Sequence, residues 1–321
     1  MPVRVVEGVI QHYEWGDPDF IPKLLGVAGR GQPWAELWLG THPNGPTVLE
    51  NGAPLSDITG PLPYLLKVLS ASKPLSLQAH PTSAQAEVGH RAGTFDDPFA
   101  KPELLVALTP FDALCGVRPV DATLALLDAI GADSLRAVVA SDGPGAAMAG
   151  LYRGEIDPTP IIDACRPCDL PEARWVVELS DRYPGDPSVA VTLLLNLVSL
   201  APGDALHLTA GNLHAYLRGS GIELMGASDN VVRGGLTVKD VDVELLLEVV
   251  DPTPLAEPVM AVTDGRYPLP EADVVLVRLE VGDSHTAVGH ELAVSLDGTT
   301  LYLSPGTQVY ADSTTFVVTP S

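Results

Sequence analysis

The sequence predicts a mainly β protein with an α-helical insertion, and three observations support this fold class. From the start to about residue 118, short apolar stretches alternate with turn signals such as "GDPD" and "ENGAP", as in strands joined by tight turns. From Pro119 to about residue 200, Ala and Leu recur at helical spacing. From residue 201 onward the strand-like alternation returns. We therefore expect strands that precede the helical segment in the sequence and strands that follow it to form the β-sheet.

These changes along the chain suggest three structural parts. They are a β domain expected to carry the functional site (residues 1–118 and 201–254), a helical insertion (residues 119–200) and a C-terminal β unit (residues 255–321). Within the insertion, "SDGPGAAMAG" predicts a flexible linker between helices. The final run, "DPSVAVTLLLNLVSL", predicts a helix with Asp186 as N-cap and Pro187 in the first turn. After the insertion, "VDVELLLEVV" predicts one further helix.

Composition narrows the setting of the protein. The chain has 321 residues, of which 46% are hydrophobic, so it can bury a large core. Its 41 acidic and 18 basic residues give a net charge of −23, which argues against nucleic acid or an anionic membrane as a partner. The start, "MPVRVVEGVI", lacks the features of a signal peptide, and "VAVTLLLNLVSLA" is too short to span a bilayer. We expect a soluble cytoplasmic protein, either a monomer or a weak homo-oligomer.

The cysteines do not indicate a disulfide framework, because the chain has only three. Cys165 and Cys168 form a lone "CRPC", which is compatible with a redox pair or with half of a metal knuckle. No second pair completes a knuckle and no clear strand precedes the motif, so we expect no function there. Cys115 is expected to be a small buried hydrophobic residue.

Polar residues recur on the faces of otherwise apolar strands. In "PLSLQAHP", alternation places Ser76, Gln78 and His80 on one face. In "FAKPELLVALTPF" it places Lys101 and Glu103 on one face. A buried polar group must find a partner or cost several kcal/mol. These strand faces are therefore candidates for a site.

A possible metal centre emerges if these strands share one barrel. With His214 of "GNLHAYL", they would supply two imidazoles, one carboxylate and one amide oxygen, from His80, His214, Glu103 and Gln78. Zinc accepts such ligands, and a single anionic ligand leaves positive charge to polarise a substrate oxygen. No spacing here matches a compact zinc motif, however, and a histidine on a strand is commonly a hydrogen-bonded core residue. The residues alone leave both interpretations open.

The lysines add a second hint, because the chain has only five of them. Lys67, Lys101 and Lys239 lie in apolar or turn-rich segments that we predict to surround one cavity. A lysine on a core strand is costly unless it is paired or meets an anion. Lys101 and Lys239 are thus candidate contacts for an anionic substrate, and an ion pair with Glu103 is the alternative for Lys101.

Several motifs follow one another in order over most of residues 5–250. They are "YEWG" at 13–16, "AELWLGTHP" at 35–43, "LPYLLKVLSASKPLSLQAHP" at 62–81, "KPELLVALTPFDALCGVRP" at 101–119 and "GNLHAYLRGSGIELMGASDNVVRGGLTVK" at 211–239. Together they resemble the type I phosphomannose isomerase family, the mannose-6-phosphate isomerases of the cupin fold. The resemblance implies cupin-type jelly-roll barrels plus a helical domain. It also implies a phosphorylated hexose as substrate, interconversion of mannose 6-phosphate and fructose 6-phosphate through an enediolate, and one Zn²⁺ per chain.

The resemblance also implies roles for particular residues. In the family the "LQAHP", "KPE" and "HAY" strands carry the zinc ligands, which correspond here to Gln78, His80, Glu103 and His214. The family's active-site arginine lies in "SDN-x-x-R", which corresponds to Arg233.

We add further candidates from the chemistry of the reaction. Glu223, near Arg233 in sequence, is our candidate for carrying the proton between C2 and C1, and a zinc-bound water or another group in the pocket is the alternative. Ser76 shares the face of the metal ligands and is a candidate contact for phosphate. Trp15 either forms a wall of the pocket or fills the core.

Two features depart from the family pattern. Phe99-Ala100 stands where family members carry Asn-His, and the C-terminal unit is short. These departures keep two alternatives in view, namely a non-catalytic cupin that binds sugar phosphates and a metal cupin isomerase acting on a different aldose phosphate. The four ligand positions and the arginine are all present, which favours an enzyme.

Overall fold

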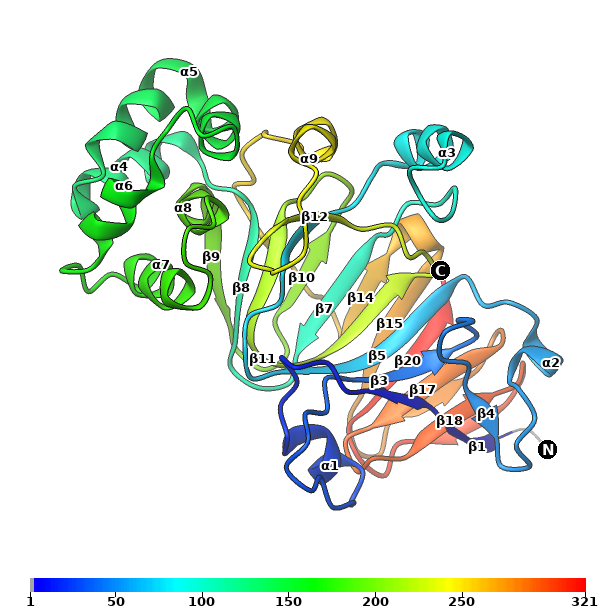
Figure 1. Cartoon of the computed structure of the whole chain (residues 1–321). Helices are drawn as coiled ribbons and strands as arrows, with labels where there is room; N and C mark the ends of the chain where they lie inside the picture. Colours follow the sequence, from blue (N-terminus) through cyan, green and yellow to red (C-terminus); the bar gives the residue numbers. More distant parts are fainter. Residues whose placement is uncertain (1–2) are drawn as a thin grey trace.

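The computed structural model describes residues 3–321 and contains two large antiparallel sheets with a group of helices at one end (Figure 1). The α-helices are α1 (Phe20–Leu24), α2 (Ser56–Thr59), α3 (Ser83–Ala92), α4 (Val120–Ile130), α5 (Asp133–Tyr152), α6 (Pro158–Cys165), α7 (Pro171–Arg182), α8 (Ser188–Val191) and α9 (Val243–Val249). Short 3₁₀ turns lie at η1 (Thr192–Leu194) and η2 (Pro270–Ala272). No helix among residues 3–321 combines the length and apolar character that a membrane span needs.

The larger sheet is formed by strands that lie between residues 9 and 260. Its strands are β2 (Val9–Gln11), β3 (Glu36–Gly40), β5 (Tyr64–Ala71), β6 (Leu77–Ala79), β7 (Glu103–Ala107), β8 (Phe111–Val117), β9 (Leu195–Leu200), β10 (Ala205–Leu208), β11 (His214–Gly226), β12 (Val232–Gly235) and β13 (Val259–Met260). The helix predicted near residue 245 is confirmed as α9.

The long strand β11 lets this sheet fold over on itself. Its first half pairs with β6 and β8, whereas its second half pairs with β5 and β7. The change of partners occurs at Gly219, whose φ of 129° lies in a region that L side chains rarely adopt. A Cβ at this position would lie 2.6 Å from Cδ2 of Phe111. Glycine therefore permits the bend, which places β6, β7 and β11 around one interior.

The smaller sheet contains the C-terminal strands and two strands from the start of the chain. They are β1 (Val3–Glu7), β4 (Val48–Leu49), β14 (Arg266–Leu269), β15 (Val274–Leu279), β17 (Glu291–Ser295), β18 (Thr300–Leu303) and β20 (Thr315–Pro320). A separate ribbon pairs β16 (Ser284–Thr286) with β19 (Gln308–Tyr310). Because β1 pairs with β18, the first strand of the described residues belongs to the same sheet as the C-terminal strands. The domain boundaries suggested by the sequence stay a prediction.

Two predictions within the helical segment are wrong. The predicted linker "SDGPGAAMAG" lies inside α5, which kinks where Gly143 adopts a φ of 83° and Pro144 resumes the helix. The predicted final helix is only the short α8 followed by η1, and Leu195–Leu200 forms strand β9 instead, paired with β8. Pro187 rather than Asp186 occupies the N-cap position of α8. Pairing with an available strand outweighs the helical spacing of this run.

The helices pack directly against the strands of the larger sheet. Leu127 of α4, Leu151 of α5 and Val189 of α8 belong to the same apolar core as Leu77 of β6 and Val232 of β12. In Figure 1 the helices α4–α8 gather beside β8 and β9, away from the C-terminal strands. The helical segment is therefore packed against the two strands that carry Gln78 and Arg233.

Candidate active site and metal centre

The larger sheet encloses a cavity of about 900 Å³. Most of the residues proposed from the sequence line it: Trp15, Ser76, Gln78, Lys101, Glu103, Glu223, Arg233 and Lys239. The remaining two, His80 and His214, are buried, with exposures of 0% and 1%. The structure therefore brings all of the proposed site residues to one place.

Strand register explains how residues distant in sequence become neighbours. Gln78 on β6 pairs with His214 on β11 at one side and with Arg233 on β12 at the other. Glu103 begins β7, where it pairs with Met225 of β11. The proposed ligand Gln78 thus lies between a histidine and the proposed catalytic arginine.

The two histidines and Glu103 form a compact cluster whose ligand atoms all lie within 4.8 Å of one another. Nε2 of His80 lies 3.2 Å from Oε1 of Glu103, and Nε2 of His214 lies 3.4 Å from Oε2. The side-chain nitrogen of Gln78 is placed 3.4 Å from Nε2 of His214, and exchanging its amide atoms would turn the oxygen toward the cluster.

The donor set of this cluster fits a zinc ion. Nε2 of His80 and Oε2 of Glu103 are buried and have no hydrogen-bond partner, although the first lies near Oε1 of Glu103 and the second lies near Nε2 of His214. Buried polar atoms are normally satisfied, so these atoms point to a missing partner. Two imidazoles, a carboxylate and an amide oxygen are ligands that zinc accepts.

The orientation of both imidazoles favours metal binding through Nε2. Nδ1 of His80 lies 2.8 Å from the carbonyl oxygen of Asn230, and Nδ1 of His214 lies 2.8 Å from that of Asn212. A carbonyl oxygen can only accept, so each Nδ1 carries the proton and Nε2 keeps its lone pair. Burial also lowers the pKa of His80, which favours the neutral imidazole that a metal needs.

Asn230 holds this arrangement in place through its side chain. It is 1% exposed, its Nδ2 donates to the carbonyl oxygens of Asp97 and Phe99, and its Oδ1 accepts from the backbone N–H of Asp96. The same residue therefore ties the turn before the "KPE" strand to the carbonyl group that orients His80. This turn contains the Phe99-Ala100 departure, and the Phe99 side chain is exposed.

A buried ionic network lies beside the metal cluster. Nζ of Lys67 is 3.3 Å from Oε1 of Glu36 and 3.0 Å from Oε2 of Glu223, and Nε1 of Trp38 donates to Glu36 over 2.7 Å. Burial alone would lower the pKa of Lys67, but Glu223 and Glu36 raise it, so the lysine stays charged. Burial raises the pKa of Glu223, and Lys67 offsets only part of that rise.

The structure also shows where the candidate residues Lys101, Trp15 and Lys239 lie. Lys101 both lines the cavity and lies 3.4 Å from Oε1 of Glu103, so the ion pair and the position at the cavity coexist. Trp15 lines the cavity, stacks on Tyr13 with ring centroids 5.7 Å apart, and also packs against a core cluster. Lys239 is exposed at the cavity rim.

Some residues that line the cavity were not predicted from the sequence. Glu36 and Tyr216 line the cavity, as do Lys73 and Arg182. The signal for Glu36 was available, since alternation in "AELWLG" places it on one face with Trp38. Arg182 carried no such signal, because it ends a helix that is remote in sequence from the site strands.

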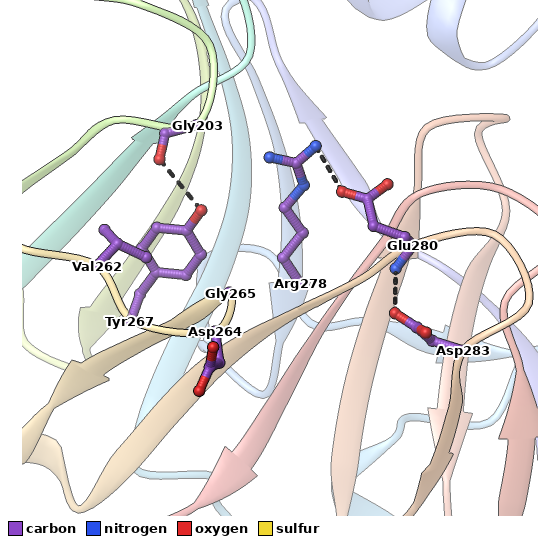
Figure 2. Close-up of a pocket in the computed structure, with 8 residues that line it drawn as sticks. All are labelled: Gly203, Val262, Asp264, Gly265, Tyr267, Arg278, Glu280 and Asp283. Carbon is purple, nitrogen blue, oxygen red and sulfur yellow. Dashed lines mark hydrogen bonds and ion pairs between the residues drawn. The ribbon is translucent and has the colours of Figure 1, made fainter.

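The three cysteines are not among the residues that line the cavity. Cys115 is buried as expected, Cys165 is buried, and Cys168 is partly exposed. Figure 2 shows a second cavity of about 410 Å³, lined in part by Arg278, Glu280 and Tyr267. Its arginine is already paired with Glu280 at 2.7 Å, and the Tyr267 hydroxyl donates to the carbonyl oxygen of Gly203 over 3.1 Å.

Comparison with known proteins identifies the family. The family model described as phosphomannose isomerase type I, catalytic domain, matches residues 55–120. A mannose-6-phosphate isomerase from Salmonella typhimurium is 32% identical, over 89% of this chain and 86% of the relative. This chain belongs to the type I mannose-6-phosphate isomerase family. A human mannose-6-phosphate isomerase is 30% identical, over 93% of this chain and 88% of the relative.

Solved structures of this family share the fold. A mannose 6-phosphate isomerase bound with zinc and yttrium has a TM-score of 0.83 and 27% identity, and covers 100% of this chain and 97% of that chain. The apo form from Salmonella typhimurium also has a TM-score of 0.83, with 28% identity and the same coverage. The predicted fold class, mainly β of cupin type with a helical part, is thereby confirmed.

Proposed function

We propose that this protein is a zinc-dependent aldose–ketose isomerase that interconverts mannose 6-phosphate and fructose 6-phosphate. The observation that carries the proposal is the buried His80–Glu103–His214 cluster, which opens onto a cavity rich in cationic side chains. Relatives that share most of the chain are named mannose-6-phosphate isomerases, and one similar structure is bound with zinc. We infer one ion per chain, held by the cluster and Gln78.

The reaction moves a proton between C2 and C1 of the open-chain sugar through an enediolate. When bound, zinc supplies positive charge that polarises the substrate's carbonyl and hydroxyl oxygens. We assign Arg233, which pairs with Gln78 in the sheet, to stabilising the negative oxygen of the enediolate or to assisting ring opening, because a planar guanidinium can donate two parallel hydrogen bonds.

Glu223 is our candidate for the proton carrier. Its carboxylate takes the proton from C2 of the aldose and returns it to C1, and the ketose forms when the proton of the C2 hydroxyl has also passed to the C1 oxygen. Burial raises its pKa, so it is a stronger base than an exposed glutamate, while the contact with Lys67 helps to keep it ionised.

The substrate's phosphate is assigned to cations that line the cavity. Lys101 and Lys239 are candidate contacts for phosphate or hydroxyl groups, and Ser76 can donate a hydrogen bond from the same side of β6. Trp15 forms part of the cavity wall. The chain's net charge of −23 does not prevent binding, since distant charges are screened beyond about 8 Å at physiological salt.

A coupled assay for fructose 6-phosphate tests the proposal. Turnover of mannose 6-phosphate should disappear on chelation and return with zinc. His80→Gln should abolish both zinc binding and turnover, whereas His90→Gln should change neither, because His90 is an exposed histidine on α3. Binding of mannose 6-phosphate without turnover in the zinc-loaded protein would instead indicate a non-catalytic sugar-phosphate binder. Turnover of another aldose phosphate alone would change the assigned substrate.

A further inference from the structure

Four cationic side chains at the cavity have no ion pair within the described residues. They are Lys73, Arg182, Arg233 and Lys239, and each lines the cavity. The chain has 41 acidic and 18 basic residues, so carboxylate partners are abundant. Among residues 3–321 other cations, such as Arg118 and Arg153, have taken such partners. The group at the cavity is therefore available for an anion from outside the chain.

Arg182 differs from the others in its origin. It is the last residue of α7, within the helical segment, and it reaches the cavity together with Tyr183. A cation at a helix C-terminus is favoured by the helix dipole, which explains the residue type but not its place at the cavity. Arg174 provides the contrast, because it is exposed on the same helix but does not line the cavity.

The segment after α7 is bonded to the strand that carries Arg233. The backbone N–H of Leu236 donates to Oδ2 of Asp186 over 2.8 Å and to Oγ of Ser188 over 3.0 Å. The hydroxyl of Tyr152 donates to the carbonyl oxygen of Gly234 over 2.5 Å. The helical segment is thus fixed against the stretch of chain that follows Arg233 and leads to Lys239.

The close packing between Gly235 and Ser188 leaves little room for the helical segment and the strand with Arg233 to move relative to each other. Gly235 has a φ of 122°, and a Cβ there would overlap the side chain of Ser188. Both Ser188 and Leu236 are buried. The end of α7 and the loop with Lys239 are therefore held together beside the cavity, which Arg182, Arg233 and Lys239 all line.

We propose that Arg182 contacts the phosphate group of the substrate, so that the helical segment supplies a specificity-determining residue. The inference rests on the proposed function and assigns one further residue to its substrate. A guanidinium matches the geometry of a phosphate through paired hydrogen bonds. Because this contact is remote from C1 and C2, it stabilises the bound substrate and the transition state alike, and its loss should act mainly on KM.

The test compares three purified variants with the wild type. Arg182→Gln should raise the KM for mannose 6-phosphate about tenfold or more, with kcat within about twofold, since a hydrogen bond to a charged group is lost. The inhibition constant of inorganic phosphate should rise in parallel. Arg182→Lys should retain part of the affinity through its charge. Arg174→Gln, the matched change on the same helix, should leave both constants at the wild-type value.

The same variants separate failure of this inference from failure of the proposed function. If the wild type turns over and Arg182→Gln matches Arg174→Gln in KM and in phosphate inhibition, Arg182 has no role in phosphate binding. If the wild type binds mannose 6-phosphate in a calorimeter without converting it, a weaker affinity of Arg182→Gln alone still supports the contact. If the wild type shows neither turnover nor binding, both proposals are overturned.

Discussion

Both large sheets contain buried glutamate, and the carboxylates of Glu291 in the smaller sheet and Glu103 in the larger one are satisfied in different ways. In the smaller sheet, Glu291 is 0% exposed and accepts from the Val288 N–H over 2.8 Å and from the Thr319 hydroxyl over 2.9 Å, while Nε2 of His285 lies 2.6 Å from its other oxygen. In the larger sheet, Oε2 of Glu103 is buried without a hydrogen bond.

This difference shows why burial of a charged residue does not by itself mark a functional site. The carboxylate of Glu291 is saturated by neighbouring groups of the C-terminal strands and turns, so nothing remains for a ligand. Glu103 faces two histidines whose Nδ1 atoms are already engaged elsewhere, and its buried Oε2 has no hydrogen-bond partner within the described residues. Of these two glutamates, only Glu103, the one with incomplete partners, lines the cavity.

The largest effect on turnover is expected when Glu103 is replaced by glutamine, with Glu291→Gln as the comparison. Glu103→Gln removes the only anionic ligand of the proposed zinc site, and the rate should fall by about 10³-fold or more, since the metal supplies several kcal/mol of charge stabilisation. Glu291→Gln should keep the wild-type kcat. Metal content and turnover, measured on both folded proteins, check this. A Glu103→Gln enzyme with normal zinc and normal rate would remove Glu103 from the site.

A smaller effect is expected at Glu223, which is buried like Glu291 but borders the cavity. Glu223→Gln keeps the shape of the side chain and removes the base, so kcat should fall by about 10²-fold or more while zinc stays bound. Single-turnover kinetics on zinc-loaded protein give the rate of the chemical step. Near-normal rates would assign the proton transfer to another group in the cavity.

The hydrogen bonds that orient His80 should influence the metal rather than the chemistry. Asn230→Ala frees the turn around Asp97 and the carbonyl group that positions His80, so zinc affinity should weaken by about 10- to 100-fold. A competition titration with a zinc chelator measures this directly. At saturating zinc much of the turnover should return; unchanged affinity would show that the backbone alone holds the histidine.

The smallest effect concerns the stability of the smaller sheet. Burial would raise the pKa of Glu291, but the contacts with His285, Val288 and Thr319 hold it below its usual value. A depressed carboxyl pKa stabilises the fold above the unfolded-state pKa of about 4.3, and this contribution is lost as pH falls through the folded-state pKa. Glu291→Gln should therefore lower the free energy of unfolding by about 1–3 kcal/mol at pH 7.

Denaturant unfolding of the wild type and Glu291→Gln at a series of pH values checks the sign. The difference between the two proteins should be constant near neutral pH and should shrink below about pH 4.3. A difference that grows as the pH falls would mean that the carboxylate destabilises the native sheet, contrary to its hydrogen bonds.

Much of the candidate site could be predicted from the sequence because strand alternation is a local property. The period of two placed Gln78 with His80 and Lys101 with Glu103, and the structure brings these pairs together with His214. The ordered motifs supplied the family, which the comparisons confirm. Helical spacing was less reliable, since it predicted a helix where β9 pairs with β8.

The sequence by itself determined which side chains share a strand face and which family the chain belongs to. Only the tertiary structure decided which strands are neighbours, and therefore that Lys67 meets Glu36 and Glu223 and that Arg182 reaches the cavity from a helix. The physical reason is that side-chain direction follows from the backbone of a single strand. Contacts between distant segments depend instead on sheet pairing and on the burial of a shared apolar core, which no local pattern encodes.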